Sequence, residues 1–122
     1  MRERDAQIRV IHELQRRCAR DATWWAVPNS LAANATARAR AREEGLRPGV
    51  PDLCFLKAGK PLYIEMKSEN SGRSTIMAVT DAQVALHREI TDAGGRVAVC
   101  FGVDETLKQL EDWRVLERRC QR

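Results

Sequence analysis

The chain has 122 residues, of which 43% are hydrophobic and 31% are charged. This length and balance predict one folded domain over residues 1–122, and they exclude a disordered chain. No apolar stretch approaches the length of a membrane span and the charged N-terminus is unlike a signal peptide, so we expect a cytoplasmic protein without membrane contact. The net charge of +4 mildly favours an anionic partner.

The four cysteines argue against a metal site built from thiolates. They are widely spaced without a CxxC pair, and two of them, Cys54 and Cys100, fall inside apolar runs. We interpret them as free thiols that act as small core residues.

Apolar periodicity and turn residues predict eight elements in the order α-β-α-β-β-α-β-α. Helices are expected at residues 5–20, 31–44, 80–92 and 104–118, and strands at residues 23–27, 52–57, 62–67 and 96–101. The alternation of helices and strands predicts an α/β domain with a mixed sheet flanked by helices.

Particular residues support these elements in chain order. Ile8, Ile11 and Leu14 lie at helical spacing and predict the inner face of the first helix. The first strand is rich in strand formers and stops at Pro28, and the Ala- and Arg-rich second helix ends at Gly45. Between residues 68 and 79 the chain is polar and reads as a loop.

The two central strands form a predicted hairpin that sets two acids face to face. A two-residue turn at Ala58-Gly59, with pairing counted outward from it, places Asp52 opposite Glu65 in a non-hydrogen-bonded pair. Lys67 lies two residues beyond Glu65 and shares its face. Gly59 at the second turn position does not fit the most favoured turns well, and a slip of one residue would separate the acids.

Two facing carboxylates repel each other, and a bound divalent cation would remove that repulsion. Oxygen ligands without imidazole or thiolate suit Mg²⁺ or Mn²⁺, which bind phosphate oxygens and activate water. A neighbouring lysine orients that water or stabilises developing charge. Asp52, Glu65 and Lys67 are therefore a candidate phosphodiester-cleaving site. The alternative is a solvated hairpin face with a Glu65–Lys67 ion pair.

Further motifs give nearly the whole chain a resemblance to a known family. It resembles the virus-type replication–repair nuclease domain, VRR-NUC, of the PD-(D/E)xK nuclease superfamily. The matching features are Glu3 and Gln7 of the opening helix, Val27-Pro28-Asn29, Gly49-Val50-Pro51-Asp52, Glu65-Met66-Lys67, Gln83, and Gly94-Gly95 before the last strand.

The resemblance implies a restriction-endonuclease-like core with a metal-dependent active site. Asp52 and Glu65 would be metal ligands, the backbone carbonyl of Met66 a further ligand, and Lys67 the catalytic lysine. The expected cofactor is Mg²⁺ or Mn²⁺.

Gln83 and Glu3 each have two interpretations. The resemblance implies that Gln83 joins the catalytic group and that Glu3 reaches the metal through water. From the residues alone, Thr80 and Gln83 form a capping box, and Glu3 lies near a helix start, where an acid is favourable. The two roles of Gln83 are compatible. Its placement stays open, because the 68–79 loop is longer than in compact family members.

Four residues are candidate DNA contacts. Arg38 and Arg42 share a helix face, which suits phosphate binding, although a solvated helix face is the alternative. Arg47 and Asn29 complete the set.

These features together predict a Mg²⁺- or Mn²⁺-dependent DNA endonuclease, selective for junctions, flaps or nicks in replication, recombination or repair. The resemblance to free-standing viral copies implies a phage or prophage source and a homodimer. The alternative is a catalytically idle module on the same fold that binds DNA or a partner.

Overall fold

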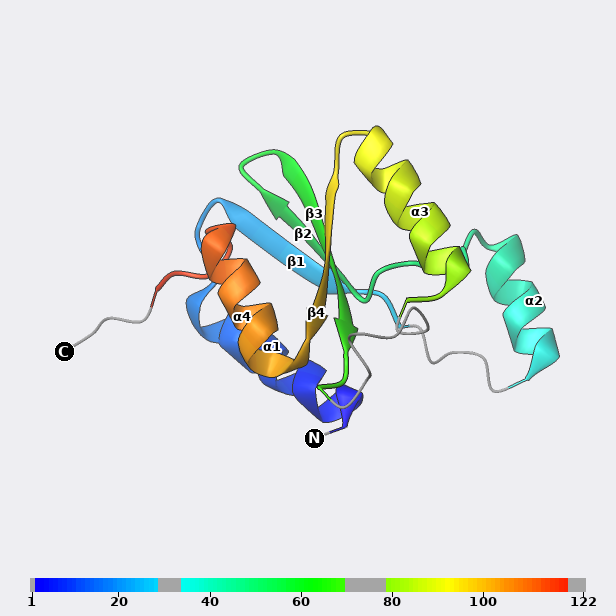
Figure 1. The fold of residues 1–122 in the computed structure, drawn as a ribbon, viewed down its shortest axis with the longest axis horizontal. Coiled ribbons are helices and arrows are strands. Elements are labelled where there is room, and N and C mark those ends of the chain that lie inside the picture. The colour runs from blue at the N-terminus through cyan, green and yellow to red at the C-terminus, as the bar shows by residue number, and fades with distance from the viewer. Residues whose placement is uncertain (1, 29–33, 70–78, 119–122) are drawn as a thin grey trace.

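The computed structural model describes residues 2–28, 34–69 and 79–118, and in them a four-stranded sheet has helices on both sides (Figure 1). The elements are α1 (Glu3–Arg17), β1 (Ala22–Ala26), α2 (Ala35–Glu43), β2 (Leu53–Lys57), β3 (Lys60–Lys67), α3 (Asp81–Asp92), β4 (Arg96–Phe101) and α4 (Gly102–Asp112). The strands lie in the order β1-β2-β3-β4, with only β3 and β4 parallel. The predicted α/β class, element order and mixed sheet are confirmed.

The β2–β3 hairpin has the predicted register, so Asp52 faces Glu65 one step beyond the last ladder pair. The expectation that Gly59 suits the turn poorly is wrong. Ala58 and Gly59 have φ angles of 49° and 82°, and a type I′ turn requires positive φ at both positions. The ladder continues up to this turn through the pair Lys57 and Lys60, so β3 begins two residues before its predicted start.

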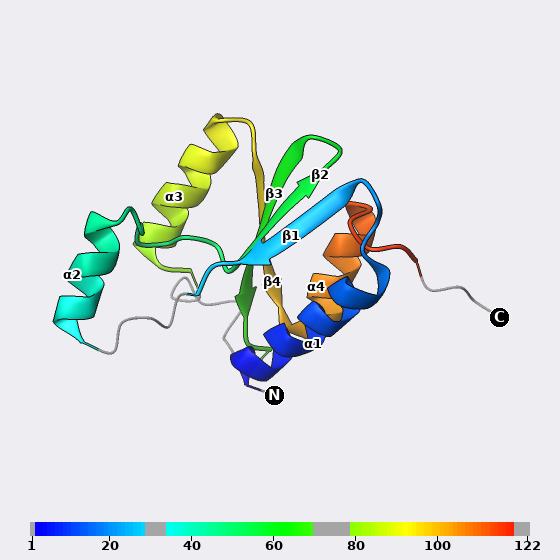
Figure 2. The same ribbon diagram turned by 180° about the vertical axis from the view of Figure 1, so that it is seen from behind.

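The core lies between the sheet and the pair α1 and α4, and α3 packs against β4 from the other side (Figures 1 and 2). The hairpin contributes five apolar side chains that are at most 4% exposed: Leu53, Phe55, Leu62, Ile64 and Met66. From α1 come Ala6, Val10 and Leu14. Cys54 and Cys100 are buried free thiols, as predicted.

The predicted inner face of α1 is partly wrong. Leu14 is buried, but Ile8 is 36% exposed and Ile11 is only partly buried. The helix turns Ala6 and Val10 toward the sheet instead, and this rotation leaves Ile8 at the surface.

Both α1 and α4 end earlier than residues 20 and 118, where the sequence predicted their ends. After α1 the chain is extended at Cys18, and after α4 it turns at Arg114, whose φ is 61°. Cys18 and Leu116 then form an isolated antiparallel bridge, and Val115 and Leu116 lie in the core at 0% and 2% exposure.

Helix α2 stands away from the sheet and has no buried residue (Figures 1 and 2). It begins after Asn34, whose side chain accepts a hydrogen bond from the Ala37 N–H at 2.8 Å. Asn29, the first residues of the predicted second helix and most of the predicted 68–79 loop lie outside the described residues. No described helix is long and apolar enough to cross a membrane.

Candidate active site

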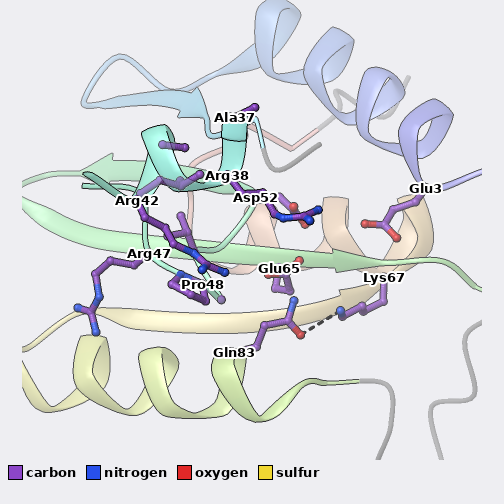
Figure 3. Close-up of a pocket in the computed structure, with 14 residues that line it drawn as sticks. Glu3, Ala37, Arg38, Arg42, Arg47, Pro48, Asp52, Glu65, Lys67 and Gln83 are labelled. Atoms are coloured by element: carbon purple, nitrogen blue, oxygen red, sulfur yellow. Dashed lines mark hydrogen bonds between the residues drawn. The ribbon is translucent and has the colours of Figure 1, made fainter. Parts of the chain in front are cut away.

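Three carboxylates meet at the end of the β2–β3 hairpin that lies away from its turn. Oxygens of Glu3, Asp52 and Glu65 lie within 4.8 Å of one another. Asp52 and Glu65 occupy facing hairpin positions, and Figure 3 shows Glu3 reaching toward them from the first turn of α1. Asp52 is 7% exposed and Glu65 only 2%. Glu3 is exposed, but two acids as close and as buried as Asp52 and Glu65 need protons or a cation to offset their repulsion.

Asp52 is fixed by the backbone around it. Its Oδ2 accepts a hydrogen bond from the Met66 N–H at 2.8 Å, and its carbonyl oxygen accepts one from the Val27 N–H at 2.9 Å. Glu65 differs, because its buried Oε1 has no hydrogen-bond partner within the described part of the chain. A buried polar atom without a partner is costly, so this oxygen indicates room for a ligand.

Burial raises the pKa of Glu65 to about 9, with the hydrogen bond and negative charge of Asp52 adding to the shift and Lys67 opposing it. Burial and Asp52 also raise the pKa of Glu3, and Lys67 again opposes the change. Glu65 therefore binds a proton at neutral pH unless a cation takes the place of that proton.

Lys67 is tied to α3 through Gln83, as Figure 3 shows. The Lys67 Nζ donates a hydrogen bond to the Gln83 Oε1 at 3.0 Å, and the Thr80 N–H donates to the same oxygen at 3.0 Å. The Thr80 hydroxyl accepts from the Gln83 N–H at 3.2 Å, which completes the predicted capping box. Gln83 thus caps α3 and holds Lys67 at once, while its part in catalysis stays a prediction.

Gly49 lets the loop before β2 lie against the first turn of α3, a contact that was not predicted from the sequence. A Cβ at this position would lie 2.4 Å from the Ala82 carbonyl oxygen, and the φ of Gly49 is +87°. Both the close approach and the backbone conformation require glycine. The signal in the sequence was Gly49 itself, placed between prolines in a motif that also carries Asp52.

A cavity of about 350 Å³, the arginine hollow, opens beside the carboxylates between α2, the loop before β2 and the start of α3. Arg38 and Arg42 line it and Arg40 does not, in agreement with the predicted shared face. Arg47 lines it as well, but its guanidinium forms an ion pair with Glu89 at 2.6 Å. The remaining candidate DNA contact, Asn29, lies outside the described residues.

His87 lies one turn after Gln83 on α3 and is half-buried. Its Nε2 is buried, and among the described residues it has no hydrogen-bond partner. Burial lowers its pKa, and the charge of Lys67 adds to this effect.

The mixed sheet with acids and a lysine at one strand end places the chain among nuclease-like α/β domains. The sequence model of the VRR-NUC domain matches residues 2–104, and the chain belongs to this family. A solved structure described as a VRR_NUC domain protein has the same fold, with a TM-score of 0.69 and 20% identity over 95% of this chain and 90% of that one. No curated protein sequence matches the chain.

The substitution Glu65→Gln tests the buried acid. Between pH 4.5 and about 9, Glu65 binds a proton in the folded state and loses it in the unfolded state, so the free energy of unfolding falls as pH rises. Without metal, we expect Glu65→Gln to remove this decline and to stabilise the protein at pH 8 by roughly 1–3 kcal/mol. Urea unfolding with EDTA at pH 5 and pH 8 measures both effects. Glu43→Gln on the exposed face of α2 is the control, and an equal response of the two variants would contradict the prediction.

The substitution Gly49→Ala tests the contact between the loop and α3. Gly45 also has a positive φ, of +102°, but a Cβ there would meet nothing within 4 Å. Gly45→Ala should cost about 1 kcal/mol through backbone strain alone, and Gly49→Ala clearly more because of the added clash. Urea unfolding compares them. Equal losses would show that the close approach to Ala82 is unimportant.

Proposed function

We propose that this protein is a metal-dependent DNA endonuclease of the PD-(D/E)xK type that hydrolyses phosphodiester bonds. The observation that carries the proposal is the meeting of three carboxylates beside Lys67 and the arginine hollow, one of them with a buried oxygen that has no partner among the described residues. Membership in the VRR-NUC family supports nuclease activity.

The carboxylate cluster fits Mg²⁺ or Mn²⁺. Its three side chains offer only hard oxygen ligands, which these ions prefer. The free Oε1 of Glu65 suits direct ligation together with Asp52, the Met66 carbonyl is the proposed backbone ligand, and Glu3 is proposed to act through water. When bound, such an ion polarises the phosphate, activates water and neutralises the charge that develops.

Lys67 supplies the fixed positive charge of the site. Its bond to Gln83 holds the ammonium group on the same sheet face as Glu65. An ammonium in this place stabilises the negative charge that builds on the phosphate oxygens, and it orients the attacking water. Gln83 acts through Lys67 and is therefore a positioning residue.

Arg38 and Arg42 are the proposed contacts to the DNA backbone. Both are exposed on a helix that has no buried residue, so they can meet phosphates without unpacking the core. We propose a junction, flap or nick as the substrate and a homodimer as the active form, because the sequence resembles family members of that kind. Selectivity of this type depends on DNA shape.

A catalytically idle DNA-binding module is the second candidate. The observation in its favour is that the α2 arginines would bind phosphates whether or not the carboxylates hold a metal ion. The complete set of Asp52, Glu65 and Lys67 favours the enzyme, because a silenced site usually loses one of its members.

Removal of the Lys67 ammonium separates these candidates. We expect Lys67→Ala to lower the Mg²⁺-dependent single-turnover cleavage rate at least about 100-fold, the usual effect of removing a group that stabilises transition-state charge. The control Lys60→Ala removes the same charge from the exposed far end of β3 and should cut at nearly the wild-type rate. The substrates are nicked, flapped, four-way and linear duplexes of one sequence.

Binding of the same DNAs, measured in Ca²⁺, should be retained by both variants. If wild-type protein binds these DNAs and cuts none of them, or if Lys67→Ala cuts as fast as wild type, the endonuclease proposal is wrong.

A further inference from the structure

A second cavity lies beside the carboxylates, between α1 and the end of β1. Its volume is about 450 Å³, and Glu3 and Asp52 line both this cavity and the arginine hollow. The two cavities therefore meet at the cluster. Figure 3 shows Glu3 on the side of the carboxylates that lies away from Arg42. We call the second cavity the α1–β1 hollow.

The lining of the α1–β1 hollow differs in chemistry from that of the arginine hollow. Ile8 and Ile11 line it from one face of α1, and Val27 and Pro28 line it from the chain after β1. Among the described residues that line it, Arg4 is the only basic one. A polyanionic backbone would gain little in such a place, whereas a flat apolar group would lose contact with water.

The position of these side chains is fixed by the fold. The rotation of α1 that buries Ala6 and Val10 leaves Ile8 facing the hollow at 36% exposure. On the opposite wall, the bond from the Val27 N–H to the Asp52 carbonyl oxygen holds the chain after β1 beside the carboxylates. The fold therefore fixes the apolar lining of the hollow directly beside the carboxylates.

We propose that the α1–β1 hollow binds the base of a nucleotide next to the phosphate that is cut. This inference rests on the proposed endonuclease function. A nucleotide carries its phosphate and its base on different sides of the sugar, and the cluster has a basic cavity on one side and an apolar cavity on the other. The volume lies in the range of cavities that bind small organic groups.

The proposal also names the class of DNA that the site prefers. A base enters a protein cavity only after it leaves the stack, and this costs least where the base is mismatched or already unpaired. Nicks, flaps and junctions offer such bases beside a phosphodiester. The hollow therefore selects a phosphate that is flanked by an unpaired base, and it needs no recognition of sequence.

The test uses a flapped duplex in which a tetrahydrofuran residue, which lacks a base, replaces the nucleotide on the 5′ or the 3′ side of the cleaved phosphate. We expect one of the two replacements to slow wild-type single-turnover cleavage about tenfold, in line with the loss of one buried apolar contact surface. Ile8→Ala should cut intact DNA more slowly and lose the difference between intact and abasic substrate.

Leu56→Ala is the matched control, because Leu56 is an aliphatic side chain of similar exposure, 42%, on β2 and does not line the hollow. It should keep the full abasic effect. If wild-type protein cuts both abasic DNAs like intact DNA, or if Ile8→Ala keeps the same abasic effect, the inference is overturned. Lys67-dependent cleavage would then still support the endonuclease proposal.

If the protein cuts no DNA, a binding measurement tests the inference instead. In Ca²⁺, a flapped duplex with 2-aminopurine at the junction base should gain fluorescence when wild-type protein binds and unstacks that base. Ile8→Ala should show less of this gain at saturation, and Leu56→Ala should show all of it. An equal gain in all three proteins, or none in wild type, would contradict the inference.

Discussion

The site depends on two carboxylates that repel each other and are nevertheless held face to face. The ladder of the β2–β3 hairpin fixes Asp52 opposite Glu65, and the bond from the Met66 N–H to the Asp52 carboxylate keeps them from turning apart. Because both side chains are buried, solvent does little to screen the repulsion. The folded chain therefore favours a proton or a cation at this point, and the raised pKa of Glu65 expresses that preference.

The surrounding structure brings the other charges to this pair. Gly49 allows the loop before β2 to touch the first turn of α3, and that turn presents Gln83 to Lys67. The packing of α1 on the sheet brings Glu3 to the pair from near the N-terminus. Two packing contacts, of Gly49 with α3 and of α1 with the sheet, thus bring Gln83 and Glu3 to the hairpin site. In the proposed mechanism, Glu3 contacts the metal ion through water, Lys67 supplies the ammonium group beside the phosphate, and Gln83 positions Lys67.

The sequence predicted the hairpin site because it is a local structure. Pairing counted from a two-residue turn decides which residues face each other, so Asp52, Glu65 and Lys67 followed once the turn was located. The approach of Glu3 was only implied by family resemblance, since it depends on how α1 packs. The same limit explains the error at Ile8. Two sets of α1 residues lie at helical spacing, one with Ile8 and Ile11 and the other with Ala6 and Val10, and both sets include Leu14. The helix packs the second set, which has the smaller side chains, against the sheet.

The most direct test of this account is calorimetry of Mn²⁺ binding near pH 7.5 in buffers of different ionisation enthalpy. With a Glu65 pKa of about 9, metal binding must displace a proton, so wild-type protein should bind Mn²⁺ and release about one proton. Glu65→Gln should bind much more weakly and release none. Absence of Mn²⁺ binding by wild type, or binding without proton release that Glu65→Gln leaves unchanged, would contradict a cation held by the facing pair.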